Sequence, residues 1–273
     1  MIIVLLIRGL YICEENANMY VDTGIERNKA DYMQLMDELS GVLTPEKQQM
    51  LADMEEKNNS ISQEIADSGL RNFQGELADE EYWNICKKNV GFHSLRNKVD
   101  LIQAQADYVK EDMSKRYFMY ENGWKQFFGN RNINYPLLFL LIISITAIFC
   151  RDYETDMYRI NRTTANGDAV CYISKITAGI IVSVFTAWSF WLEDILTAHM
   201  RFGLNNPDYP LQSISMFKDS RFDMTIGNTA LLCLLFSILG AAFFSVILMF
   251  AAILFRKNMY AIVVSLAVCV LPV

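Results

Sequence analysis

Hydrophobic residues occur in five runs along this chain, at 1–13, 133–150, 176–192, 225–255 and 259–273. A polar block at 14–132 separates the first two runs, and shorter polar segments at 151–175 and 193–224 separate later ones. A soluble domain would interleave apolar and polar residues at the period of a helix or strand. Segregation on this scale therefore predicts an all-α, multi-pass membrane protein.

We expect about five spanning helices from these runs. The run at 1–13 is shorter than the roughly 20 residues that a span needs, so it predicts a partial first transmembrane helix. The run at 259–273 begins a fifth helix and stops inside it, so we expect truncation at both ends of the chain. Arg8 lies in the first run, where its charge is costly unless it snorkels or faces another helix. Glu193 and Asp194 directly follow the third run, and we interpret them as solvated charges at the end of that helix.

The polar block at 14–132 is predicted to be a separate α-helical domain between the first and second spans. Thr44 and Pro45 suit the N-cap and first turn of a helix, and Gly41 suits the end of the preceding one. A 4-3-4-3-4 apolar spacing from Leu95 to Met113 predicts a helix of about 28 residues that packs against an earlier helix. The block is either a spacer between spans or a domain that contacts a substrate or an outer protein.

The segment at 151–175 mixes both charges between two apolar runs. Tyr153, Met157 and Ile160 recur at helical spacing, while charged residues cover the other faces. This pattern predicts a short amphipathic helix that lies against a membrane.

The long run at 225–255 carries small residues every four positions at Ser237, Ala241 and Ser245, with Gly240 beside them. Such a stripe lets helices approach closely, either within one subunit or between two subunits. As a helix the run would measure about 46 Å, longer than a hydrocarbon core, so it is tilted, broken near Gly240, or extends out of the bilayer.

Basic residues indicate the orientation. Segment 151–175 has four of them and Arg256-Lys257 adds two, whereas segment 193–224 has three bases and five acids. The positive-inside rule therefore predicts that 151–175 is cytoplasmic and that 14–132 is extracellular, in a protein of the cell membrane.

Composition argues against several functions. The block at 14–132 holds 22 acids and 14 bases, and the chain has a net charge of −7, so nucleic acid is not an expected partner. The sequence has no phosphate-binding loop, HExxH, GxSxG or Rossmann glycine pattern, and its two histidines and six cysteines form no metal-ligand spacing. We therefore expect no enzyme activity, no cofactor and no metal site.

The segment after the second run resembles the permease subunits of ABC-2-type ABC transporters. The matching pattern is Y-E-x-x-M-x-x-I-x-x-T-T-x-x-G followed by a lysine, formed by Tyr153, Glu154, Met157, Ile160, Thr163, Thr164, Gly167 and Lys175. The resemblance covers 133–273, and the polar block at 14–132 agrees only in its position. It implies six helices per subunit, of which this chain would be a truncated form.

The resemblance also implies partners. Two permease copies, identical or homologous, would form a dimer in the lipid, and a separate cytoplasmic ABC ATPase would hydrolyse ATP. The segment that matches 151–167 would be the coupling helix that docks on this ATPase.

Two functions follow as hypotheses. The first is the transmembrane permease subunit of an ATP-driven exporter, whose partner ATPase pushes on the 151–167 helix. The second is a non-transporting membrane sensor or scaffold, with the helices of 14–132 as its receptor.

Overall fold

The computed structural model describes residues 1–23, 29–88, 90–129, 135–163 and 167–270. These residues are mainly α-helical, and apart from two isolated bridges they form no β-strand. They divide into two compact units, which we call the polar unit and the apolar unit. The polar unit consists of residues 11–125 and 201–226, and the apolar unit of residues 1–10, 126–200 and 227–273.

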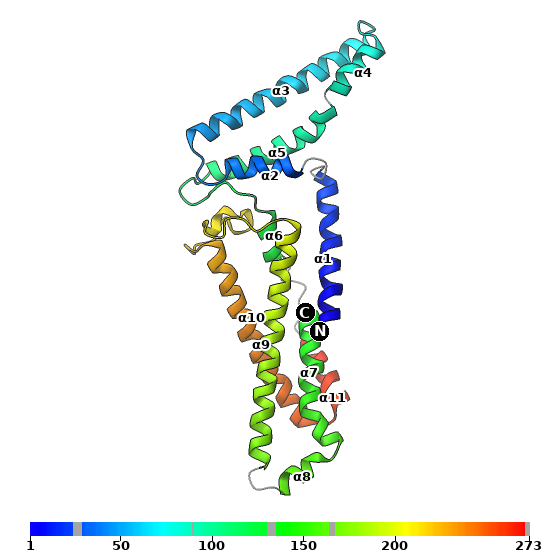
Figure 1. The fold of residues 1–273 in the computed structure, drawn as a ribbon, viewed down its shortest axis with the longest axis vertical. Coiled ribbons are helices and arrows are strands. Elements are labelled where there is room, and N and C mark those ends of the chain that lie inside the picture. The colour runs from blue at the N-terminus through cyan, green and yellow to red at the C-terminus, as the bar shows by residue number, and fades with distance from the viewer. Residues whose placement is uncertain (24–28, 89, 130–134, 164–166, 271–273) are drawn as a thin grey trace. The chain divides into compact units, whose positions relative to one another are not determined.

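A long helical hairpin forms one part of the polar unit. The chain passes from α1 (Ile2–Thr23) to α2 (Lys29–Leu39) and then into α3 (Pro45–Phe73). It returns along α3 through α4 (Asp79–Lys88) and α5 (Val90–Lys110), as Figure 1 shows. Thr44 is the N-cap of α3 and accepts a hydrogen bond from the N–H of Lys47, with Pro45 in the first turn. The predicted start of this helix is confirmed.

The core of the polar unit lies between α2 and α5. Its buried side chains include Tyr32, Met36 and Leu39 on α2 and Ile102, Ala106 and Val109 on α5. The predicted apolar seam is therefore present, but α5 has 21 residues rather than about 28. Met113 lies beyond the helix in a turn and is exposed. This turn brings Phe118 back to Gly41, where the two backbones exchange hydrogen bonds of 2.8 Å and the φ of Gly41 is +101°.

Residues 201–226 also belong to the polar unit. Their short 3₁₀ helices η3 (Leu211–Ser213) and η4 (Ser215–Phe217) are bonded to the residues around α5. The hydroxyl of Tyr108 donates to the carbonyl of Gln212 at 2.6 Å, and the N–H of Tyr117 donates to Ser213 Oγ at 3.0 Å. Two segments about 100 residues apart in the sequence thus build one compact unit.

Three helices of the described chain are long and apolar enough to cross a membrane. They are α7 (Tyr135–Glu154), α9 (Gly167–Arg201) and α10 (Ile226–Phe255). The apolar stretches Ile2–Ile12 of α1 and Asn258–Ala267 of α11 (Asn258–Val270) are shorter. The protein is therefore all-helical with three candidate spans among the described residues, where the sequence predicted about five.

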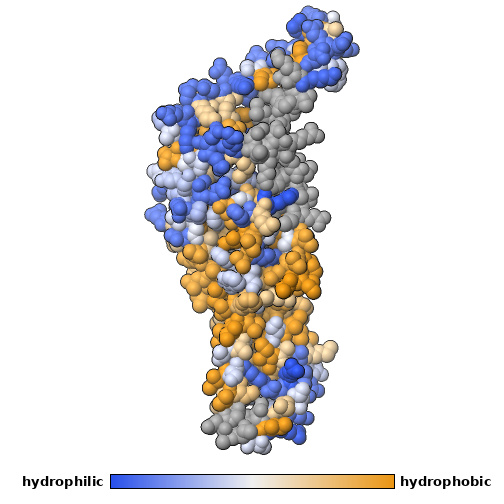
Figure 2. Space-filling model, viewed as in Figure 1, coloured by the Kyte–Doolittle hydropathy of each residue, from blue (hydrophilic) through white to orange (hydrophobic). Residues whose placement is uncertain are grey.

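The apolar unit packs α7 against α11 and α10. Leu141, Ile145 and Phe149 of α7 are buried in one cluster with Ala252 and Ala261. Large hydrophobic side chains also cover the outside of this unit, including Phe243 and Phe250 of α10, and Figure 2 shows them as a broad orange surface. A surface with so many exposed hydrophobic side chains is suited to contact with lipid hydrocarbon rather than with water.

The third span is longer than its apolar run. The sequence predicted a span at 176–192 after a loop that closes at Lys175, whereas α9 has 35 residues and begins at Gly167. Lys175 therefore lies more than two turns inside the helix. Polar residues at each end of an apolar run can continue the same helix, because backbone hydrogen bonds do not depend on side-chain polarity.

Candidate functional site

The turn between α7 and α9 contains a short helix, α8 (Met157–Thr163), as the sequence predicted for this segment. We call the end of α7, α8, the first turns of α9 and the start of α11 the α8 corner. The hydroxyls of Tyr153 and Tyr172 lie 2.7 Å apart and link α7 to α9. The ring of Tyr153 also stands 5.4 Å from that of Tyr158 on α8. Tyr153 therefore connects three of the helices that meet here.

Glu154 joins the corner to α11. Its Oε1 accepts a hydrogen bond of 2.9 Å from the backbone N–H of Asn258, the first residue of α11. The first N–H groups of a helix have no partner within it and carry partial positive charge, so a carboxylate is a favourable acceptor there. One side chain at the end of α7 thus fixes the start of a helix 104 residues later.

An ion pair ties α7 to α9 at the same corner. Lys175 Nζ lies 2.7 Å from Asp152 Oδ2, and both side chains are at least three-quarters buried. The Cys171 thiol lies 3.6 Å from the same carboxylate oxygen. Lys175 also stands 5.9 Å from the ring centre of Phe149. Lys175 thus lies where α9 meets the last turns of α7.

The backbone on both sides of the corner adopts an uncommon conformation. Asp156, between α7 and α8, has φ of 57°, and Arg256, between α10 and α11, has φ of 55°. The left-handed region is unfavourable for non-glycine residues and is held in place by surrounding contacts. Arg256 Cζ lies 5.6 Å from the ring centre of Tyr153, so the turn between α10 and α11 also lies at the α8 corner.

The outer surface of α8 is apolar at two positions of the predicted coupling helix. Met157 and Ile160 are 46% and 58% exposed. The hydroxyl of Thr163, the last residue of α8, donates a hydrogen bond of 2.7 Å to the carbonyl of Ile160 in the same helix. Gly167 is the first residue of α9, and Thr164 lies outside the described residues.

The small residues of α10 divide between two faces of that helix. Ala241 and Ser245 are buried, and the Ser245 hydroxyl donates to the carbonyl of Ala241 at 2.8 Å. Ser237 is half-buried beside α7 and α9. Gly240 is exposed, and a methyl group added to it would meet no atom within 4 Å. Within this chain, then, Ala241 and Ser245 are the members of the stripe that pack closely.

A buried cluster of three charges lies between α1 and α9. Arg8 donates from Nη1 to Glu193 Oε2 at 2.9 Å and from Nη2 to Asp194 Oδ1 at 2.7 Å. The three side chains are only 3%, 12% and 9% exposed. Arg8 Cζ also stands 5.4 Å from the ring centre of Phe190.

This cluster corrects the interpretation of Glu193 and Asp194 as solvated charges at a helix end. Both residues lie inside α9, which continues to Arg201, and both are bonded to Arg8. The apolar run ended at residue 192, so hydropathy placed them outside the span. The sequence did contain a signal for this contact, namely an arginine in one apolar run and a pair of carboxylates beside another. A charge inside an apolar run needs a partner of opposite charge. Of the two alternatives for Arg8, the structure shows that it faces another helix.

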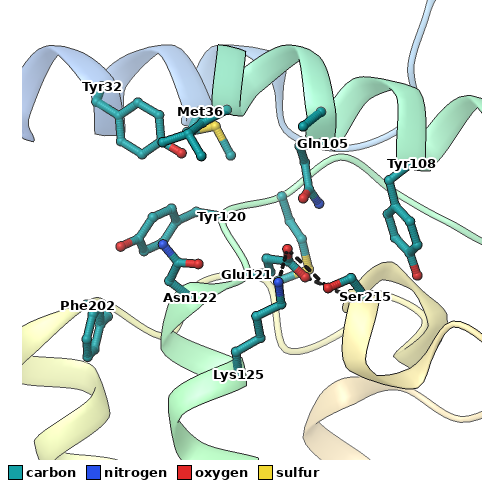
Figure 3. Close-up of a pocket in the computed structure, with 13 residues that line it drawn as sticks. Tyr32, Met36, Gln105, Tyr108, Tyr120, Glu121, Asn122, Lys125, Phe202 and Ser215 are labelled. Carbon is teal, nitrogen blue, oxygen red and sulfur yellow. Dashed lines mark hydrogen bonds and ion pairs between the residues drawn. The ribbon is translucent and has the colours of Figure 1, made fainter. Parts of the chain in front are cut away.

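The polar unit contains a cavity of about 370 Å³. Figure 3 shows it between α2, α5 and α6 (Asn122–Gly129), with tyrosines on two sides and an ion pair below. Glu121 forms that pair with Lys125 at 2.6 Å and also accepts the N–H of Ser215 at 2.8 Å. The sequence did not single out these residues, because they come from four segments that are separate along the chain.

No group of three or more metal-ligating side chains occurs among the residues that the structure describes. No protein-family model, curated protein or solved structure matches this chain.

Proposed function

We propose that this chain is the membrane-embedded permease subunit of an ATP-driven exporter of the ABC-2 type. In this proposal the α8 corner receives force from a separate ATPase, and the three long apolar helices α7, α9 and α10 cross the cell membrane. The observation that carries the proposal is the way in which the corner is tied to several apolar helices at once.

A push on α8 would reach α7 through the ring contact between Tyr158 and Tyr153, and three further contacts would pass it on to the other helices. Glu154 connects the end of α7 to the start of α11, Lys175 connects α9 to Asp152 of α7, and Tyr153 connects α7 to α9. Charge-assisted hydrogen bonds of this length are roughly twice as strong as neutral ones. A displacement of α8 would therefore move α7, α9 and α11 together and would not bend a single loop. A transporter that alternates between two arrangements of its helices requires such a joint movement.

The distribution of basic residues supports the proposed orientation. Arg151 lies in the last turn of α7, Lys175 lies near the start of α9, and Arg256 approaches Tyr153. The basic residues of two separate turns therefore meet at the α8 corner. The positive-inside rule then places the corner in the cytoplasm and the polar unit outside the cell. A cytoplasmic α8 is a requirement for contact with an ATPase.

Met157 and Ile160 form the surface that we assign to the ATPase. Both are exposed on a helix of only seven residues, and Tyr158 of the same helix packs on Tyr153 of α7. Exposed apolar side chains beside charged ones, on a rigid element, are typical of a docking surface. The resemblance to ABC-2 permeases further implies a second permease copy in the complete transporter.

The test is co-purification of the full chain with the ATPase encoded by a neighbouring gene. We expect the double variant Met157→Ser/Ile160→Ser to weaken binding by about tenfold, because two apolar contacts at an interface contribute roughly that much. Met200→Ser is the matched control, since Met200 is 83% exposed but lies near the other end of α9. Equal binding by the double variant and the wild type would exclude α8 as the docking point.

A second variant separates docking from transmission. Glu154→Ala removes the acceptor for the first N–H of α11 but leaves Met157 and Ile160 in place. We expect this variant to bind the ATPase normally and to lose transport and the stimulation of ATP hydrolysis. Normal transport by Glu154→Ala would contradict the role of this contact.

The second candidate function is a membrane sensor or scaffold that uses the polar unit as its receptor. The cavity in that unit is the observation in its favour. Replacing residues 20–120 by a short linker distinguishes the two functions. Retained ATPase binding and transport would support the permease, whereas a loss of signalling without any measurable transport in the wild type would support the sensor.

A further inference from the structure

We propose that the cavity of the polar unit is a binding site for a small, uncharged organic molecule with an aromatic or aliphatic body and a carbonyl or hydroxyl acceptor. This inference does not depend on the proposed transport function, because it concerns equilibrium binding to one unit of the chain. It follows from the size of the cavity, the side chains on its walls and one amide group without a partner.

The size and walls of the cavity suit a small organic ligand. Its volume of about 370 Å³ lies at the lower end of the range of about 300–1,000 Å³ that is common for small-molecule sites. Tyr32, Tyr120 and Phe202 line it and are almost fully buried, as are Met36 and Met119. Aromatic rings and flexible thioethers together form a surface that adapts to flat or irregular apolar groups.

The charges at the cavity are already neutralised within the protein. Lys125 Nζ lies 2.6 Å from Glu121 Oε1, while Glu121 Oε2 accepts the N–H of Ser215 at 2.8 Å. Figure 3 shows this group at one side of the cavity, with dashed lines that join Glu121 to Lys125 and to the Ser215 hydroxyl. A charged ligand would have to compete with this pair for its counter-charge. An uncharged ligand avoids that cost.

Gln105 supplies the polar contact. It points from α5 toward the cavity in Figure 3, and its Nε2 is buried without a hydrogen-bond partner. A buried amide nitrogen without an acceptor is unfavourable, and an acceptor on a ligand would relieve it. The hydroxyl of Tyr108 does not compete for that ligand, because it donates to the carbonyl of Gln212 at 2.6 Å.

The cavity is open to small molecules from outside. Leu101 and Ala104 line it and are exposed on the surface of α5. Burial raises the pKa of Tyr32 above its ordinary value, with Tyr120 and Glu121 adding to the effect, so its hydroxyl stays protonated and uncharged across the physiological range. An open aromatic site whose charges are paired and whose wall carries the unpartnered Gln105 amide donor therefore defines the ligand class.

The probe for this site is naphthalene-2-carboxamide, an uncharged two-ring amide with one carbonyl acceptor. Binding is measured by calorimetry on the full chain in lipid nanodiscs, with empty nanodiscs subtracted to remove partition into lipid. We expect a Kd of about 0.1–1 mM, which is ordinary for a ligand of this size. The carboxylate and ammonium analogues, naphthalene-2-carboxylate and 2-naphthylmethylammonium, should bind at least about tenfold more weakly.

Two variants tie the binding to the cavity. Ala104→Trp fills the cavity from an exposed position and should abolish binding, and Gln105→Leu keeps the volume but removes the donor and should weaken binding by about five- to tenfold. Gln103→Leu is the matched control on the same helix, because Gln103 does not line the cavity. Thermal unfolding checks that each variant is folded.

Several results would overturn the proposal. These are no binding of the amide to the wild type, equal binding by the wild type and Ala104→Trp, or tighter binding of either charged analogue. If Ala104→Trp does not fold, equal binding by the wild type and Gln105→Leu overturns it instead.

Discussion

The polar and apolar units are both helical, but they are stabilised by different contacts. The polar unit encloses an aliphatic and aromatic core that includes Leu39, Ile102 and Phe118. The apolar unit exposes large hydrophobic residues such as Phe243 while it buries Arg8 and Asp194. A surface of the second kind is stable only against lipid, where a charge must find its partner inside the protein. The same type of substitution should therefore have different effects in the two units.

The largest expected difference concerns ion pairs. Arg8→Ala leaves Glu193 and Asp194 buried without their partner, and we expect a loss of about 3–5 kcal/mol in the free energy of unfolding. Lys110→Ala removes an exposed pair with Asp107 in the polar unit and should change stability little. Thermal unfolding of the full chain in nanodiscs measures both.

A further variant shows whether the loss comes from unpaired charge. Replacing Glu193 and Asp194 by Gln and Asn in the Arg8→Met background removes all three charges together, so we expect it to recover part of the lost stability. Equal unfolding temperatures for Arg8→Ala and Lys110→Ala would show that the buried cluster does not hold α1 against α9.

Leucine substitutions should give the next largest difference. Leu39 is fully buried in the polar unit, so Leu39→Ala should cost about 2–4 kcal/mol through lost apolar contacts and the cavity that remains. Leu239→Ala is the matched change on α10, where the side chain is 55% exposed and should matter much less. Unfolding of both variants in nanodiscs gives the comparison, and a larger effect at Leu239 would indicate that a partner covers this face.

Glycine substitutions should give the smallest difference. A methyl group on Gly123 would collide with the backbone carbonyl of Gly203 in the polar unit, so Gly123→Ala should cost about 1–3 kcal/mol. At Gly179 in the apolar unit the nearest atoms belong to the flexible end of Met249, which can move aside. Gly240→Ala meets nothing and should stabilise α10 by about 0.5–1 kcal/mol through helix propensity. The order of unfolding temperatures for the three variants tests this series, and equal effects at Gly123 and Gly240 would contradict it.

The two units also differ in how far their functional features could be predicted. In the apolar unit, the pattern of Tyr153, Met157 and Ile160 correctly indicated a short helix at Met157 and Ile160, but Tyr153 lies on α7, before the turn at Asp156. The contact between Glu154 and Asn258 could not be predicted, because it joins residues 104 positions apart. In the polar unit, the apolar seam predicted from Leu95 to Met113 was visible in the sequence, and Ile102, Ala106 and Val109 of that seam lie in the core. The cavity was not, because its walls come from segments without a shared pattern.

The sequence by itself determined the helical character, the division into polar and apolar stretches and the helix start at Thr44, because these depend on neighbours within a few residues. Only the tertiary structure decided that α9 continues past residue 192 and that Arg8 meets Glu193 and Asp194. It also decided that residues 201–226 complete the polar unit. Local hydropathy reports only the preference of each residue for water or lipid. The buried charge of Arg8 is stabilised by Glu193, a partner that lies 185 residues away in the sequence.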